Sequence, residues 1–193
     1  ISNNEKGERW KAIYYRSLAI GQGQYEMTSL QIANFIAAIA NRGYWYTPHL
    51  VKGTRVGNDR KDQSLNIQRH DIAIDREHFE TVVSGMRQTV LNGTARVAQI
   101  PGIDICGKTG TVQNRFGDHS VFTAFAPKDN PKIAILVYIE NGGYGGTVAA
   151  PIASLMTERY LNGKIAKNRK WLEKRILKKD MTLRGESSIR EMK

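Results

Sequence analysis

The stretch Ile105-Cys106-Gly107-Lys108-Thr109-Gly110-Thr111-Val112 is extended in character and leads into a short polar turn. The chain then returns as a second apolar segment from His119 to Phe125. Because successive strand residues point to opposite faces, Thr109 and Thr111 share one face and Lys108 points to the other. An ammonium group followed by two hydroxyls suits a ligand that ends in a carboxylate. The stretch therefore predicts a hairpin whose first strand contacts an anionic group.

Hydrophobic periodicity predicts the elements around this hairpin. Thr28 with Gln31 forms a capping box that opens one helix, and Gly43 ends it. A second helix begins after Asp75 and stops at Asn92-Gly93, and a third begins near Thr147. Short links between the strands make them antiparallel neighbours. The predicted fold class is α+β, a three-stranded antiparallel meander with packed helices, its strands at about 104–113, 119–126 and 132–140.

Each predicted helix has an apolar stripe, whereas residues 44–73 are irregular and predict an exposed loop or hairpin. The expected packing faces are Ile32, Phe35, Ile36 and Ile39 for the first helix; Phe79, Val82, Val83, Met86 and Val90 for the second; and Ile152, Leu155, Met156 and Tyr160 for the third.

Short motifs accompany Lys108-Thr109-Gly110 in a fixed order. In that order and spacing, the chain resembles the class B penicillin-binding proteins, most of all the elongation-type penicillin-binding protein 2, a peptidoglycan D,D-transpeptidase. K-T-G is the third signature of the serine enzymes that react with penicillin, after S-x-x-K and S-x-N. The resemblance covers roughly residues 17–163 and rests on the segments 18–24, 28–34, 40–43, 47–50, 92–95, 122–127, 144–146 and 149–151.

The resemblance implies a role for each residue of the motif. In the family, an active-site serine attacks the penultimate D-Ala carbonyl, and an acceptor amine resolves the acyl-enzyme. By motif position, Lys108 is the catalytic group that supplies positive potential and helps proton transfer. The Thr109 and Thr111 hydroxyls bind the carboxylate of the substrate or β-lactam, and the Thr111 N–H is one oxyanion-hole donor. Gly110 lets the substrate backbone lie against the strand, and no cofactor is implied.

The chain departs from the family pattern in its serines. None of the nine serines has a lysine three positions later, so S-x-x-K is absent. The strings Ser2-Asn3-Asn4 and Ser64-Leu65-Asn66 match S-x-N, but neither lies at the family's position. We therefore expect residues 1–163 to be the C-terminal part of a transpeptidase domain, inactive without the nucleophile. The alternative is a non-catalytic penicillin-binding-like module that binds a partner or senses β-lactams.

The resemblance also implies partners and a location for the full-length protein. The expected ligands are peptidoglycan stem peptides and, together with the missing N-terminal part, β-lactams. The expected protein partners are a membrane glycosyltransferase and elongation-complex proteins, at the periplasmic face of the bacterial inner membrane. The family's five-stranded sheet takes two strands from upstream sequence, which would leave the strand at about 132–140 unpaired. An unpaired apolar edge predicts self-association of this chain.

The net charge of +11 is concentrated in a basic tail, residues 164–193, whose eleven Lys or Arg and four acids give +7. Within it, Ile165, Trp171, Leu172, Ile176 and Leu177 could form a short amphipathic helix. The preferred interpretation is a solvated, loosely packed extension, with attraction to anionic lipids as the alternative. No nucleic-acid recognition motif accompanies the charge, so binding to nucleic acid is not expected.

Other features predict structural roles. No apolar run is long enough for a membrane span, the N-terminus lacks a signal-peptide pattern, and the missing initiator Met suits a fragment. Cys106, the single cysteine, reads as a small buried hydrophobe. The four histidines have no metal-ligand spacing, so no metal site is expected. The glycine-rich segment 142–146 lacks the phosphate-loop Lys and reads as a flexible connector near the cleft mouth.

Overall fold

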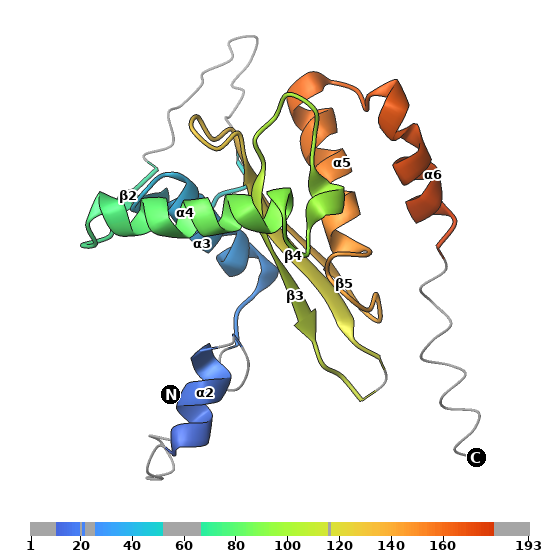
Figure 1. Cartoon of the computed structure of the whole chain (residues 1–193). Coiled ribbons are helices and arrows are strands. Elements are labelled where there is room, and N and C mark those ends of the chain that lie inside the picture. The colour runs from blue at the N-terminus through green and yellow to red at the C-terminus, as the bar shows by residue number, and fades with distance from the viewer. Residues whose placement is uncertain (1–10, 20, 22–25, 52–66, 116, 180–193) are drawn as a thin grey trace.

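A three-stranded antiparallel sheet forms the centre of the computed structural model, which describes residues 11–19, 21, 26–51, 67–115 and 117–179 (Figure 1). The strands are β3 (Cys106–Val112), β4 (His119–Ala126) and β5 (Ile133–Ile139), in the order β3-β4-β5. The predicted meander and the α+β class are confirmed, with strand ends shifted by two residues at most.

The register of the sheet determines which side chains share a face. Thr109 lies opposite Phe122 and Thr111 opposite Ser120, whereas Lys108 lies opposite Thr123. Directly opposed residues of an antiparallel pair point to the same face. The two threonines of β3 therefore share a face with the buried Phe122, and Lys108 points to the other face, as the sequence predicts.

Helices cover both faces of the sheet (Figure 1). Helix α5 (Ala149–Asn162) packs on the face of Phe122, where Ala124, Ile135 and Val137 contribute to one hydrophobic core. Helices α3 (Ser29–Ala40) and α4 (Arg76–Leu91) pack on the opposite face in a second core. A sheet buried on both faces needs strands that are apolar on both, which explains the nearly continuous apolar run of β5.

The two ends of α3 follow local sequence signals. Thr28 and Gln31 form the predicted capping box, in which the Gln31 N–H donates to Thr28 Oγ1 over 3.3 Å. At the other end, the N–H groups of Arg42 and Gly43 donate to the carbonyls of Ile39 and Ala38, the pattern of a Schellman motif. Arg42 takes the left-handed conformation at φ 58°, one residue before the glycine that the sequence indicates.

Arg42 is held in this conformation by contacts that link α3 to α4 and the sheet. Its Nε donates to Glu80 Oε1 over 3.1 Å, and its guanidinium lies 5.8 Å from the centre of the Phe125 ring. The ion pair, together with Arg76, lowers the pKa of the Glu80 carboxyl. These two contacts of the side chain offset the cost of the left-handed backbone.

The predicted packing faces of the helices need correction at four positions. Phe35, Val82, Met156 and Tyr160 are exposed, and Asp75 occupies the N-cap position of α4 without a capping hydrogen bond from its side chain. Helix α5 instead buries its smaller residues, because small side chains let a helix approach a sheet closely. The buried residues of α5 are Ala149, Ala150, Pro151, Ala153, Ser154, Leu155, Thr157 and Glu158.

Smaller elements flank this central unit. β1 (Tyr44–Tyr46) pairs antiparallel with β2 (Arg69–Asp71), which agrees with the second of the two alternatives predicted for residues 44–73, a loop or a hairpin. Helix α2 (Ala12–Ala19) has no buried residue. A 3-10 turn, η1 (Arg96–Ala98), precedes β3, and another, η2 (Lys167–Arg169), leads into helix α6 (Lys170–Leu177).

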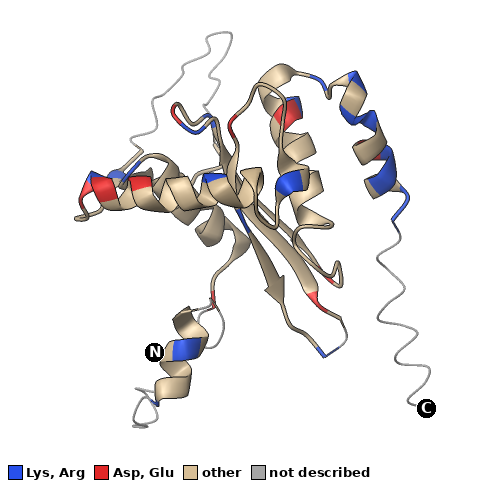
Figure 2. Ribbon diagram, viewed as in Figure 1, with Lys and Arg blue, Asp and Glu red and all other residues tan. Residues whose placement is uncertain are grey.

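Helix α6 is the amphipathic helix predicted in the basic tail, and Figure 2 shows lysine and arginine along its length. It is not loosely packed: Leu172 is 1% exposed, and α6 contacts α5. Arg169, just before it, is buried and pairs with the buried Glu158 at 2.7 Å. Across the described ranges, no helix is both long and apolar enough to cross a membrane.

Candidate active site

The four predicted site residues, Lys108, Thr109, Gly110 and Thr111, lie in the middle of β3. β3 pairs with β4 along one edge, and no other described strand pairs with its second edge. An open strand edge can add an extended peptide through main-chain hydrogen bonds. The strand thus combines the backbone groups of an open edge with two hydroxyls on one face and an ammonium group on the other.

Lys108 has an exposed side chain whose Nζ donates to the carbonyl of Thr109 over 2.8 Å. None of the ion pairs found among the described residues includes Lys108. An ammonium group without a carboxylate partner keeps its positive potential available for an anion. The Thr123 hydroxyl donates to the Lys108 carbonyl over 3.5 Å, and a hydrogen bond of this length contributes little to the stability of the strand pair.

The Thr109 hydroxyl is not isolated, because its oxygen lies 2.8 Å from the hydroxyl oxygen of Thr94. Thr94 follows α4 in the turn that begins at Asn92. A hydroxyl carries one proton and two lone pairs, so a bond donated by Thr94 leaves the Thr109 proton free for a ligand. Thr111 makes no side-chain hydrogen bond to another described residue.

Thr94 is the residue near the site that sequence reasoning did not single out. Its motif belongs to the ordered series, but nothing in the sequence places its hydroxyl beside a strand residue fifteen positions later. Such a contact is tertiary, so neither periodicity nor motif spacing reports it. The only hint in the sequence was that residues 94 and 109 are both threonines. Threonine is too common for this to predict a contact between them.

The glycine-rich segment packs tightly against β3 and is not a flexible connector. A Cβ added to Gly145 would lie closer than 3.0 Å to the carbonyl oxygens of Gly110 and Val121. A Cβ on Gly146 would come equally close to the carbonyl oxygen of Thr94. Glycine is needed here for close backbone approach. The segment therefore supports β3 and the Thr94 turn from the α5 side.

A buried serine fixes the end of this segment. Ser120, which is fully buried on β4, donates through Oγ to the carbonyl of Tyr144 over 3.0 Å. The same oxygen accepts from the Ala149 N–H over 3.1 Å, at the start of α5. One hydroxyl therefore joins β4, the glycine-rich segment and α5, at the β4 position that lies opposite Thr111 in the sheet.

The start of β3 is held by α4. Arg87 donates to the carbonyl of Ile105 over 3.1 Å and also pairs with Asp104. Cys106 follows, fully buried, and burial raises the pKa of its thiol to about 11, against a smaller opposing effect of Arg87. The thiol is therefore neutral at neutral pH and unreactive. This agrees with the prediction of a small buried hydrophobe.

The histidines and the two S-x-N strings are not part of the motif on β3. His70 stacks on Trp45, with ring centres 4.0 Å apart, and His119 Nδ1 accepts from the Asn141 N–H over 3.0 Å. Within the described ranges, no three His, Cys, Asp or Glu side chains gather as they would around a metal. The two S-x-N strings, Ser2-Asn3-Asn4 and Ser64-Leu65-Asn66, lie outside the described residues.

Comparison with known proteins identifies relatives of this arrangement. A family described as "Penicillin binding protein transpeptidase domain" matches residues 2–158. The peptidoglycan D,D-transpeptidase MrdA of Haemophilus influenzae is 34% identical over 193 residues, covering 88% of this chain and 29% of the relative. The peptidoglycan D,D-transpeptidase PbpA of Mycobacterium tuberculosis is 33% identical over 159 residues, covering 75% of this chain and 31% of the relative.

Solved structures give the same result. The penicillin-binding protein PBP2 of Pseudomonas aeruginosa, solved with WCK 5153, has a TM-score of 0.70 at 34% identity, over 86% of this chain and 37% of that one. Penicillin-binding protein A of M. tuberculosis, solved as a ceftriaxone acyl-enzyme, has a TM-score of 0.69 at 28% identity, over 75% and 35%. This chain thus spans about a third of each relative. It belongs to the penicillin-binding protein transpeptidase domain family, of which it carries the C-terminal part.

Proposed function

We propose that this chain is the C-terminal portion of a peptidoglycan D,D-transpeptidase that cross-links stem peptides through a serine acyl-enzyme and is acylated by β-lactams. The observation that carries the proposal is the Lys108-Thr109-Gly110-Thr111 stretch on an open strand edge, in a chain of this family. The chain contributes one wall of the active site. The nucleophilic serine comes from sequence that this chain does not contain.

The wall would act on the substrate through groups that β3 already orients. The Thr109 and Thr111 hydroxyls share a face and would bind the terminal carboxylate, close to the positive potential of Lys108. Gly110 carries no side chain, so a peptide backbone can lie against the strand. The Thr111 N–H would donate to the oxyanion that forms when the serine attacks the carbonyl. Lys108 would also assist proton transfer around the S-x-N serine.

The proposal also covers the substrate, location and protein partners of the full-length protein. Peptidoglycan stem peptides are the substrates, and the full-length protein would act at the periplasmic face of the inner membrane. Its partners there would be a membrane glycosyltransferase and other proteins of the elongation complex. Support comes from relatives named as peptidoglycan D,D-transpeptidases.

The proposal is tested by Lys108→Ala in the longer protein that contains this sequence. We expect acylation by a fluorescent penicillin to slow by roughly a hundredfold or more, the scale of positioned acid–base and electrostatic groups. Lys132→Ala is the matched control, because Lys132 is an exposed lysine just before β5, away from the motif. Thr111→Val should mainly weaken carboxylate recognition. Acylation of Lys108→Ala within a few-fold of the parent would show that the motif is misassigned.

Two further measurements test the proposal, one on this chain alone and one on the longer protein. Without an S-x-x-K serine, it should form no covalent adduct with a β-lactam, and intact-mass spectrometry measures this directly. A stoichiometric adduct on one serine of this chain would contradict the proposal. A longer protein that is acylated but does not cross-link stem peptides would be a β-lactam sensor. One that is not acylated would be a partner-binding module.

A further inference from the structure

His119, the first residue of β4, lies between two segments that flank the end of β3. It is directly opposite Val112, the last residue of that strand. Its ring Nδ1 accepts from the Asn141 N–H over 3.0 Å, just after β5. Its Nε2 lies 2.8 Å from Nδ2 of Asn114, in the link between β3 and β4. One ring therefore bridges the hairpin that carries the candidate site and the start of the glycine-rich segment 142–146.

These two contacts determine where the His119 ring carries its proton. A main-chain N–H only donates, so Nδ1, which accepts from Asn141, is unprotonated. The ring proton is then on Nε2, and the Asn114 amide must turn its oxygen toward Nε2 to accept it. The two ring nitrogens are thus engaged in opposite roles. The ring also contacts the Tyr138 ring, with centres 5.5 Å apart.

Asn141, the residue that Nδ1 holds, belongs to a tight turn that packs on the hairpin. Its φ of 55° is left-handed, which has an energetic cost for a residue other than glycine. A Cβ added to Gly117 of the hairpin would lie 3.3 Å from Asn141 Oδ1. Nearby, the Gly143 N–H donates to the carbonyl of Asp118 over 2.8 Å. His119 therefore supplies the acceptor for the first N–H of a strained turn.

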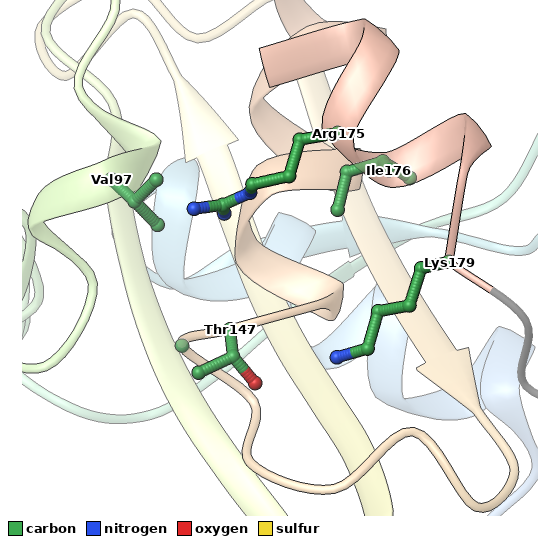
Figure 3. A pocket seen from close by; sticks show the side chains of 6 residues that line it. Val97, Thr147, Arg175, Ile176 and Lys179 are labelled. Carbon is green, nitrogen blue, oxygen red and sulfur yellow. The ribbon is translucent and has the colours of Figure 1, made fainter.

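The glycine-rich segment extends from this turn to the face of β3 that carries the two threonines. Gly145 packs on the Gly110 backbone, and Gly146 packs on the Thr94 carbonyl. The segment also borders a pocket of about 330 Å³, which lies between Val97 of η1 and the end of α6 (Figure 3). Atoms that face a pocket lack packing contacts there. The position of the segment against β3 therefore depends strongly on the hydrogen bonds at its ends.

We propose that His119 is a positioning residue for the carboxylate site formed by Thr109 and Thr111, a role that rests on the proposed function. By holding the start of the glycine-rich segment, it fixes the support of the Gly110 backbone and of Thr94. Thr94 in turn shares a hydrogen bond with the Thr109 hydroxyl. His119 acts through these residues and not on the reacting atoms, so its loss should weaken carboxylate recognition more than the chemical step.

The test measures acylation of the longer protein by a penicillin that bears a carboxylate. His119→Phe keeps a ring beside Tyr138 and removes both nitrogens. We expect the concentration for half-maximal rate to rise about five- to tenfold and the limiting rate to stay within about twofold of the parent. His119→Asn places an acceptor near the Nδ1 position and should recover most of the loss. His119→Gln, whose longer side chain reaches toward Asn114, should not.

The matched control is His70→Phe, because His70 is stacked on Trp45 in the hairpin of β1 and β2, away from β3. Its kinetics should equal those of the parent. An independent measurement is the ¹⁵N spectrum of the histidine-labelled longer protein. The ring signal that disappears in His119→Asn should show the proton on Nε2.

Several outcomes would overturn the role of His119. These are a His119→Phe variant with the parental half-maximal concentration, a limiting rate that falls as far as recognition does, and a ring proton on Nδ1. If His119→Phe does not fold, the comparison of His119→Asn with His119→Gln decides, and equal impairment of the two would contradict the role. A parent that penicillin does not acylate would instead overturn the proposed function, and this role with it.

Discussion

At the residue scale, the Thr94–Thr109 contact determines what the candidate carboxylate site can do. Two hydroxyls 2.8 Å apart share one proton between them, and the remaining proton must point elsewhere. Gly146 fixes the Thr94 backbone, since it packs on the Thr94 carbonyl. Either hydroxyl can donate in this pair, so Thr94 can act as the donor and leave the Thr109 proton available to a ligand. We assign Thr94 the role of a positioning residue.

Thr94→Val tests that role, because valine keeps the shape and removes the hydroxyl. In the longer protein, we expect acylation by a carboxylate-bearing β-lactam to weaken about five- to tenfold, roughly 1 kcal/mol. The loss should appear in the concentration for half-maximal rate more than in the limiting rate. Thr94→Ser, which restores the hydroxyl, should recover most of the activity. A valine variant with parental kinetics, or a serine variant as impaired as valine, would remove Thr94 from the site.

Cys106 gives a prediction about pH. Its pKa is raised to about 11 from an ordinary value of 9.0, so the folded state favours the protonated thiol. The thiol's contribution to stability is therefore complete below pH 9.0 and is lost as the pH rises toward about 11. Cys106→Ala should lower stability at pH 7 through the cavity it leaves, but show a shallower decline across that window. Denaturation of both proteins at several pH values checks this. Parallel curves would mean that the thiol titrates normally.

At the element scale, the sequence predicted the helix ends and strands that depend only on neighbouring residues. The capping box of α3, the stop of α4 at Leu91 and the three strands follow from neighbouring residues, and the structure confirms them. The face of α5 does not follow, because Met156 and Tyr160 are apolar yet exposed. That face is set by how closely Ala150 and Ala153 approach the sheet, which hydrophobicity alone does not report.

The attachment of α6 to α5 is a second feature that could not be predicted from the sequence. Glu158 and Arg169 are charged residues in a region that reads as polar, yet their side chains are 1% and 8% exposed. Glu158 also accepts from the Ala166 N–H over 3.1 Å, and Arg169 also donates to Ser154 Oγ over 2.8 Å. Burying two charges is tolerated because each one has both a counter-ion and a hydrogen bond.

Removing one partner of this pair should be costly. Arg169→Met leaves the Glu158 carboxylate buried and uncompensated, and we expect a loss of about 3–5 kcal/mol in the free energy of unfolding. The control is Arg159→Met, since Arg159 is the exposed neighbour of Glu158 on α5. Adding Glu158→Met to Arg169→Met should recover a large part of the loss. Chemical denaturation measures all three, and an Arg169→Met variant as stable as Arg159→Met would show that the pair is solvated.

At the scale of the whole molecule, the central sheet has two edges with different surroundings. The β3 edge carries the candidate site, whose motif residues were predictable because they lie in one continuous stretch. The support behind it was not predictable, because Thr94, Gly145 and Ser120 come from three separate segments. The β5 edge has no strand partner in the described part of the chain. Its faces are covered by α3 and α5, so only its backbone groups are left open.

An open edge on a long apolar strand predicts that this chain associates with itself when produced alone. Strand addition between two copies would satisfy the unpaired N–H and C=O groups of β5. A two-fold axis would let each copy complete the other's sheet. The basic tail opposes this through repulsion between copies, so high salt, which screens that repulsion, should increase association. Light scattering across a range of protein and salt concentrations measures the effect.

Tyr138→Lys locates the contact on β5. Tyr138 is 40% exposed, so a lysine fits there, and a charge on an edge strand discourages pairing. Tyr144→Lys makes the same substitution in the loop before α5, where the side chain is 71% exposed and away from the edge. We expect Tyr138→Lys to shift the chain toward monomer and Tyr144→Lys to leave association unchanged. Because both add one positive charge, a difference between them reports the position of the contact. A parent that is already monomeric at high concentration and high salt would show that the β5 edge is covered.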